Sequence, residues 1–197
     1  IGCGTGLSTL FYSNHVGRIT GADFAENMVQ WANRFLEDRD YFAKTMAEYA
    51  TDGAPTIGDN IRFEQGDALD LSYDDQTFDA VTVAFGLRNV QDPVAGIAEM
   101  TRVLRPGGRL LILEFAQPSN PLFSSFYRLY FFRILPLVGR MLSGSPDAYT
   151  YLPQSVWAFA GPQDLAREME SCGLKVLEQR PFLMGSVVLH VAEREGM

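Results

Sequence analysis

Cysteine and histidine are scarce in this chain, whose 197 residues include two of each. Cys3 and Cys172 form no disulfide framework, and so few thiols suit a reducing cytoplasm. His15 and His190 lack the spacing of metal ligands, so we expect no metal site. We expect Cys3 and His190 to be packing residues rather than redox or catalytic groups.

Basic residues are also in the minority. The 16 lysines and arginines stand against 24 aspartates and glutamates, which gives a net charge of −8. This excess of acid argues against nucleic-acid binding, which normally requires a basic face, although a local basic patch is compatible with it. We find no repeat, no signal-peptide pattern and no uncharged stretch close to the ~20 residues of a membrane span. The length fits one domain, residues 1–197.

Helix and strand patterns alternate along the chain, which is typical of an α/β fold with a mostly parallel sheet. The predicted strands cover residues 18–23, 61–65, 79–85, 109–115, 174–181 and 186–193. The last two strands are close enough to pair as a hairpin. The predicted helices cover residues 7–14, 27–49, 93–104 and 163–171, with a loop at 51–60 and a turn at 105–108.

Residues 121–142 depart from this alternation because they are rich in Phe, Leu and Tyr. Arg128, Arg133 and Arg140 are interspersed among them, and Pro136 should kink or split a helix here. Two interpretations stay open. The segment is either a cap packed over the sheet or a hydrophobic lid that also touches a membrane surface.

A glycine-rich turn, Gly2-Cys3-Gly4-Thr5-Gly6, stands at the start of the chain. Such a turn lets the backbone approach a ligand closely, but its spacing lacks the later glycine of the dinucleotide fingerprint. Only Ile1 precedes the turn, so we expect the strand that would aim it to be largely missing. The turn alone predicts some nucleotide-like ligand in an α/β protein.

Two carboxylates follow at the ends of the next two strands. Asp23 stands where a ribose-binding acid belongs, with a helix N-cap as the alternative. Asp67, in Gly66-Asp67-Ala68, could accept a hydrogen bond from an adenine amino group, with a turn residue as the alternative. The carboxyl ends of neighbouring parallel strands share one edge of a sheet, where ligands bind. This order favours S-adenosylmethionine as the cofactor.

Four stretches resemble the C-methyltransferases of ubiquinone and menaquinone biosynthesis, which are class I S-adenosylmethionine-dependent methyltransferases. They are Thr77-Phe78-Asp79, Ala84-Phe85-Gly86-Leu87-Arg88-Asn89-Val90, Leu104-Arg105-Pro106-Gly107-Gly108 through Leu113-Glu114-Phe115, and Tyr149-Thr150-Tyr151-Leu152-Pro153-Gln154-Ser155-Val156. The match extends from residue 1 to about residue 191. The chain departs from the family at Leu7, where Asp is usual, at Ala84, where Ser is usual, and in the missing first strand.

The resemblance implies a Rossmann-like fold with a mostly parallel sheet, an antiparallel C-terminal hairpin and a helical lid insertion over residues 119–160. The cofactor-binding residues that follow from the glycine turn, the two acids and this resemblance are Gly2, Gly4, Thr5, Gly6, Asp23, Asp67, Ala68, Ala84 and Asn89. No metal is required, because the sulfonium of the cofactor is already a strong electrophile.

The resemblance also implies methyl transfer to a ring carbon of a polyprenylated benzoquinol or naphthoquinol. Arg88 would stabilise a phenolate, with a surface salt bridge as the alternative, and Asp147 in a partly desolvated pocket could take the proton. Tyr149 and Tyr151 could hydrogen-bond the ring oxygen or simply pack in the lid, and Asn89 could orient a ligand or cap a turn.

A lipid substrate implies peripheral contact with the inner face of the membrane. Oligomeric state stays open, though the family suggests dimers. Two other functions also stay open, namely a methyltransferase acting on another small hydrophobic acceptor and a non-catalytic cofactor-binding scaffold.

Overall fold

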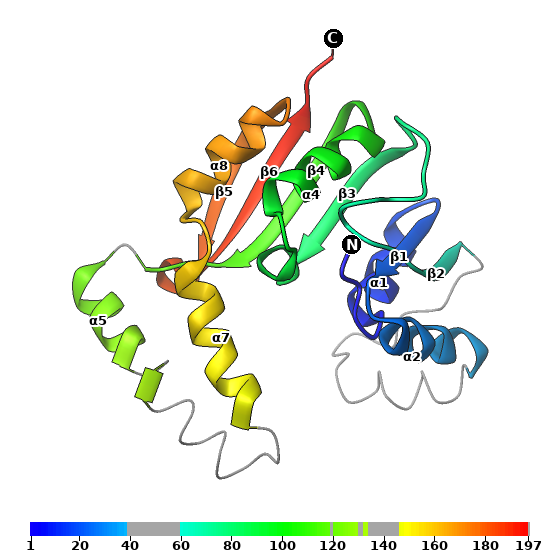
Figure 1. The fold of residues 1–197 in the computed structure, drawn as a ribbon. Coiled ribbons are helices and arrows are strands. Elements are labelled where there is room, and N and C mark those ends of the chain that lie inside the picture. Colours follow the sequence, from blue (N-terminus) through cyan, green and yellow to red (C-terminus); the bar gives the residue numbers. More distant parts are fainter. Residues whose placement is uncertain (39–59, 119, 130–131, 134–145, 197) are drawn as a thin grey trace. The chain divides into compact units, whose positions relative to one another are not determined.

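The computed structural model describes residues 1–38, 60–118, 120–129, 132–133 and 146–196 (Figure 1). The chain divides into two compact units, Ile1–Ser72 and Tyr73–Met197. Each unit contains its own sheet among the described residues. That the whole chain forms one domain with a lid insertion stays a prediction.

The first unit contains two parallel strands and their helices. Its elements are α1 (Leu7–Tyr12), η1 (Ser13–His15), β1 (Ile19–Asp23), α2 (Glu26–Glu37) and β2 (Ile61–Gln65). The register of β1 with β2 runs from Ile19 opposite Ile61 to Asp23 opposite Gln65. The predicted continuation of the helix to residue 49 and most of the predicted loop at 51–60 lie outside the described residues.

The core of this unit forms between the helices and the strand pair. In α2 the buried residues recur every three positions, so one face of the helix is apolar. That face packs with α1 and β2 in a cluster that consists of Leu10, Val29, Ala32, Phe35 and Phe63. No described strand precedes the glycine turn, but Cys3 N donates to Ala22 O at 3.0 Å, so the residues that enter the turn run beside β1.

The second unit is built on a four-stranded mixed sheet. Its strands are β3 (Phe78–Ala84), β4 (Leu104–Phe115), β5 (Leu174–Phe182) and β6 (Val187–Arg194), in the order β3-β4-β6-β5. β3 and β4 are parallel, whereas β6 is antiparallel to both β4 and β5. The predicted C-terminal hairpin is therefore confirmed.

Helices cover one face of this sheet and extend past one end of it. The helical elements are η2 (Leu87–Asn89), α4 (Pro93–Val103), α5 (Pro121–Leu129), α7 (Pro146–Ala158), α8 (Pro162–Ser171) and η4 (Leu183–Gly185). α4 and α8 lie on the same face of the sheet, whereas α5 and α7 extend beyond the end at which β3 and β4 finish (Figure 1). The Asp92 side chain caps α4 by accepting from Ala95 N at 3.0 Å, and Pro93 occupies the first turn.

The predicted turn at residues 105–108 lies inside β4 rather than before it. Phe78 pairs with Leu104, and two residues later Ala80 pairs with Arg109. The longer β4 therefore loops out its extra residues as an irregularity within one continuous pairing. Gly107 takes φ +78 there, a conformation that favours glycine.

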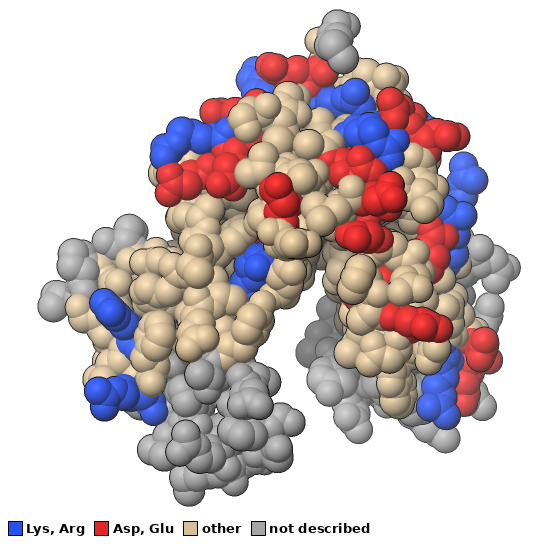
Figure 2. Space-filling view, viewed as in Figure 1, with Lys and Arg blue, Asp and Glu red and all other residues tan. Residues whose placement is uncertain are grey.

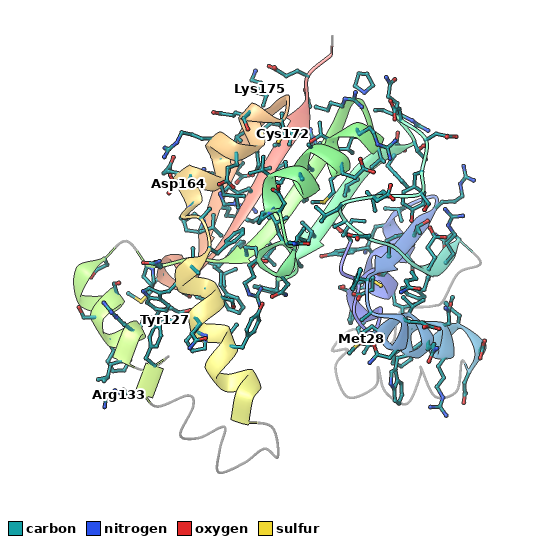
Figure 3. The ribbon with its side chains drawn as sticks, viewed as in Figure 1. Met28, Tyr127, Arg133, Asp164, Cys172 and Lys175 are labelled. Carbon is teal, nitrogen blue, oxygen red and sulfur yellow. The ribbon has the colours of Figure 1, made fainter. Side chains whose placement is uncertain are left out.

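The part of the predicted lid that the structure describes is helical and aromatic. The rings of Tyr127 in α5 and Trp157 in α7 stack with centroids 5.8 Å apart, and Phe132 meets Trp157 edge-on at 5.0 Å. Figure 3 shows Tyr127 on the side of α5 that faces α7. The expected kink at Pro136 lies outside the described residues.

Candidate functional site

The glycine turn of the first unit has a left-handed backbone at each of its glycines. Gly2, Gly4 and Gly6 have φ values of +64, +55 and +81. Gly6 N donates to Cys3 O at 2.9 Å, and Gly6 O accepts from Leu10 N at 3.0 Å. The turn is thus closed on itself and leads directly into α1, with Thr5 half-buried within it.

Two of these glycines have different surroundings. A Cβ built on Gly6 would lie 2.6 Å from Phe63 Cζ and 2.9 Å from Ala32 Cβ, so Gly6 is required by packing. A Cβ on Gly4 would meet nothing within 4 Å. The open space at Gly4 is therefore where a ligand can approach the backbone, which is the arrangement that a bound cofactor needs.

The structure places Asp23 in contact with the glycine turn. Its Oδ2 accepts from Gly4 N at 2.7 Å, and its Oδ1 accepts from Ala25 N at 2.9 Å. The second bond resembles the predicted N-cap, but the N-cap residue of α2 is Ala25 and it has no side-chain cap. The carboxylate thus joins the turn to the end of β1.

Asp67 lies at the same edge of the strand pair. Gly66 N donates to Asp23 O at 3.0 Å, so the chain leaves β2 beside Asp23. Asp67 Oδ1 accepts from Leu69 N at 2.9 Å, which is the turn-forming bond of the alternative interpretation. Ala68 is buried. The glycine turn and both predicted carboxylates are therefore brought together by the carboxyl ends of β1 and β2.

The second unit brings together a different set of residues, at the ends of β3 and β4. Phe85 follows β3 with φ +56, an uncommon conformation for a bulky residue, while its N–H still donates to Leu113 O at 2.8 Å. Phe85 O accepts from Arg88 Nη1 at 2.5 Å and from Asn89 Nδ2 at 3.5 Å. The left-handed turn at Phe85 thus aims its carbonyl back at η2.

Arg88 forms an ion pair, which is the alternative to its predicted role. The pair is buried, however, whereas the prediction places it at the surface. Its Nη1 lies 2.9 Å from Glu114 Oε2, and the side chains of Arg88 and Glu114 are 10% and 2% exposed. The guanidinium also lies 5.3 Å from the centre of the Phe115 ring. Arg88 Nε is buried without a hydrogen-bond partner among the described residues.

Glu114 is a residue of this cluster that sequence reasoning did not single out. It lies on the buried face of β4 with Leu110 and Ile112, where the alternation of the strand requires an apolar side chain. A lone carboxylate in that position is the signal that could have found it, because a buried charge needs a partner.

Tyr151 forms a hydrogen bond with Asn89. The Tyr151 hydroxyl donates to Asn89 Oδ1 at 2.8 Å, which links α7 to η2, and both side chains are exposed. Ala84, the last residue of β3, is exposed one position before Phe85. Asp147 and Tyr149 belong to α7, but their side chains lie outside the described part of the structure.

Two further titratable groups have shifted pKa values, the half-buried Cys3 of the glycine turn and the buried His190 of β6. Burial, and to a smaller extent the charge of Asp23, raise the pKa of the Cys3 thiol to about 11. Burial also lowers the pKa of His190, which is 1% exposed and whose Nε2 lies 3.0 Å from Pro162 O. The expectation that these two are packing residues agrees with their burial.

The described residues contain no group of three or more His, Cys, Asp or Glu side chains that could hold a metal ion. Within the same residues, no helix is both long enough and apolar enough to cross a membrane.

Curated relatives match over most of the chain. A demethylmenaquinone methyltransferase of Deinococcus radiodurans is 51% identical over 134 residues, covering 68% of this chain and 56% of the relative. A demethylmenaquinone methyltransferase of Staphylococcus aureus is 36% identical over 196 residues, covering 98% of this chain and 73% of the relative. The chain thus spans little more than half the length of the first relative.

Solved structures confirm the predicted fold class. The [4+2]-cyclase SpnF superposes with a TM-score of 0.70 at 16% identity, covering all of this chain and 73% of the cyclase. A SAM-dependent methyltransferase of Methanosarcina mazei superposes with a TM-score of 0.64 at 21% identity, covering all of this chain and 91% of that protein. At these identities the likeness concerns the fold.

The match to a family model confirms the family that the four sequence stretches predict. The model of the ubiE/COQ5 methyltransferase family covers residues 1–194, nearly the whole chain. The chain belongs to the ubiE/COQ5 methyltransferase family.

Proposed function

We propose that this chain is an S-adenosylmethionine-dependent C-methyltransferase whose acceptor is a polyprenylated quinol precursor of menaquinone or ubiquinone. The observation that carries the proposal is the open glycine turn beside two carboxylates at one edge of the β1–β2 pair. Family membership and the names of the relatives favour the same activity, and the demethylmenaquinone methyltransferases favour a naphthoquinol acceptor.

The residues of the first unit fit the cofactor. S-adenosylmethionine supplies an electrophilic methyl group on a positively charged sulfur. Gly4 leaves room for the amino-acid end of this molecule at the backbone, because no described residue beyond its two chain neighbours comes within 4 Å of a Cβ built there. Asp23 would accept from the ribose hydroxyls, and Asp67 would accept from the adenine amino group through Oδ2, which has no donor among the described residues. Gly2, Thr5, Gly6 and Ala68 would complete this cradle.

The residues of the second unit would act on the acceptor. In the reaction, a ring carbon of the quinol would form a bond to the methyl group as the bond between that methyl group and the cofactor sulfur breaks, which leaves the cofactor as a neutral thioether; the ring carbon would then release its proton to solvent. Ionising the adjacent phenol raises the electron density on the carbon. Asp147 would take the phenol proton, and Tyr149 would hydrogen-bond the ring oxygen. Arg88 would stabilise the phenolate from within its ion pair, while Ala84 and Asn89 would border the cofactor.

The ion pair sharpens what Arg88 can contribute. Because Glu114 balances its charge, Arg88 would stabilise the phenolate mainly as an oriented hydrogen-bond donor rather than as a free cation. We expect Arg88→Ala to reduce kcat strongly while leaving the affinity for S-adenosylmethionine near normal, because the glycine turn, Asp23 and Asp67, which would hold most of the cofactor, lie in the first unit. Loss of cofactor binding in this variant would contradict the assigned role.

We further propose that residues 119–160 form a substrate lid that touches the inner face of the membrane. Residues 117–160 contain three arginines and one acid, in a chain of net charge −8. The view in Figure 2 shows blue but no red atoms on the described part of α5 and α7. Phe126 and Leu129, both in α5, are 62% and 54% exposed. Arg133 follows α5 and lies far from the sheet of the second unit (Figure 3). Apolar side chains beside arginines suit an anionic lipid surface.

A methyl-transfer assay tests the enzymatic proposal. The chain is incubated with S-adenosylmethionine and with demethylated naphthoquinol or benzoquinol, and the methylated product is measured by mass spectrometry. Product from either quinol supports the proposal, whereas product from neither, in a chain that binds the cofactor by calorimetry, would contradict it. Light scattering on the same sample tests the dimer that the resemblance implies.

Liposome flotation tests the membrane proposal. We expect the chain to float with anionic vesicles, and we expect Phe126→Ser to reduce that binding. Val94→Ser is the matched control, because Val94 is an exposed apolar residue of α4. Equal flotation of both variants, or no flotation at all, would refute the lid contact.

A further inference from the structure

Glu114 is a buried charge in β4. Its side chain is 2% exposed, and it shares the buried face of β4 with Leu110 and Ile112. Burying a carboxylate is costly unless hydrogen bonds and an opposite charge compensate it. The strand therefore bears a destabilising residue whose contacts must account for its presence.

Both oxygens of this carboxylate hold residue 88. Glu114 Oε2 accepts from Arg88 Nη1 at 2.9 Å and from Phe115 N at 3.1 Å. Glu114 Oε1 accepts from the backbone N–H of Arg88 at 3.3 Å. A single side chain thus fixes the guanidinium and the backbone of Arg88 together.

The loop that carries Arg88 needs such a restraint. It begins at Phe85, which is held at φ +56, and Arg88 Nη1 also donates to Phe85 O. The guanidinium is further placed over the Phe115 ring. With these contacts in place, Arg88 Nε is left buried without a partner among the described residues. The contacts therefore determine which N–H groups of Arg88 are occupied and which one is left.

We infer that Glu114 is a positioning residue that sets the orientation of Arg88 for the methyl transfer. The inference rests on the proposed function, in which Arg88 meets the quinol oxygen. Glu114 does not act as the base, because its two oxygens already accept three hydrogen bonds. Its effect reaches the acceptor only through Arg88.

Steady-state kinetics of Glu114→Asp and Glu114→Gln test this role. Glu114→Asp keeps the negative charge but places it one methylene closer to the backbone. Glu114→Gln keeps the shape of the side chain without its charge. We expect kcat to fall roughly tenfold to a hundredfold, as misplaced catalytic groups do, with the KM for S-adenosylmethionine unchanged. In an Arg88→Ala background, Glu114→Gln should change kcat by less than about twofold. Glu178→Gln is the control, because Glu178 forms an exposed ion pair with Arg180.

A measurement that needs no turnover separates this inference from the proposed function. The Arg88 Nε–H signal in a nitrogen-15 NMR spectrum is assigned by its loss in Arg88→Ala, and we expect Glu114→Asp to shift it. If the wild-type chain methylates no quinol but the Arg88 Nε–H signal shifts in Glu114→Asp, the proposed function is wrong and the positioning of Arg88 by Glu114 is supported. Wild-type kcat and an unmoved signal in a folded Glu114→Asp variant would overturn the inference. If Glu114→Gln does not fold, the aspartate variant decides the question alone.

Discussion

Gly4→Ala and Gly6→Ala alter two glycines of the same turn. We expect the first substitution mainly to weaken cofactor binding and the second mainly to lower the stability of the fold. A Cβ on Gly6 would lie 2.6 Å from Phe63 Cζ and 2.8 Å from Phe63 Cε1. Such overpacking typically costs about 1–3 kcal/mol of folding free energy. The left-handed backbone at φ +81 adds about 1–2 kcal/mol for any residue with a Cβ.

The expected loss of stability for Gly6→Ala is therefore about 2–5 kcal/mol, of which the lower entropy of unfolded alanine offsets about 0.4–1 kcal/mol. Gly4→Ala carries the backbone cost of φ +55 but meets no atom within 4 Å, so its stability should fall by only about 1–2 kcal/mol. Its new methyl group instead fills the space that the cofactor requires.

Urea unfolding and calorimetric titration with S-adenosylmethionine separate the two effects. We expect Gly4→Ala to lower the urea midpoint less than Gly6→Ala does, while its cofactor affinity falls at least tenfold. We expect Gly6→Ala to unfold at a clearly lower urea concentration. If Gly4→Ala bound the cofactor as tightly as wild type, the ligand would not approach this backbone, and the assignment of the turn would be refuted.

Three further predictions concern single side chains. Tyr151→Phe removes the donor to Asn89 Oδ1, so we expect a higher KM for quinol and a nearly unchanged melting temperature. An unchanged KM together with a lower melting temperature would contradict a role in the lid. Burial lowers the pKa of His190, so the unfolded chain binds a proton more readily; stability should be complete above pH ~6.5 and should decline below it, and the decline in urea midpoint should be smaller in His190→Asn. Burial raises the pKa of Cys3 to about 11, so its alkylation by iodoacetamide at pH 8 should be much slower in the folded chain than in urea, and equal rates would contradict its burial.

The placement of Asp23 and Asp67 beside the glycine turn could be predicted because it depends on the order of local elements along the chain. Asp23 and Asp67 each follow a strand, and parallel strands bring their carboxyl ends to one edge whatever the details of the core. The packing reason for Gly6 was not predictable, because it depends on the ring of Phe63, which comes from β2. The turn motif therefore did not distinguish Gly6, which is packed against the core, from Gly4, whose surroundings are open.

The contacts of Arg88 and Tyr151 were harder to predict because they join residues that are far apart in the sequence. Arg88 pairs with Glu114, 26 residues away, and Tyr151 meets Asn89 across 62 residues. No local pattern encodes such pairings, so the sequence could single out Arg88 as a candidate but could not predict its buried partner. The turn at residues 105–108 was located correctly, yet a glycine signal does not say whether the strand resumes its pairing afterwards, as β4 does.

The hydrogen bond between Tyr151 and Asn89 links α7 and η2 thermodynamically. A ligand that moves α7 must change the freedom of η2, and by reciprocity whatever fixes η2 must change the affinity of α7 for that ligand. The strength of this link is bounded, because a single neutral hydrogen bond contributes about 0.5–1.5 kcal/mol. Through this contact alone, the state of η2 can alter the affinity of α7 for a ligand by no more than about tenfold.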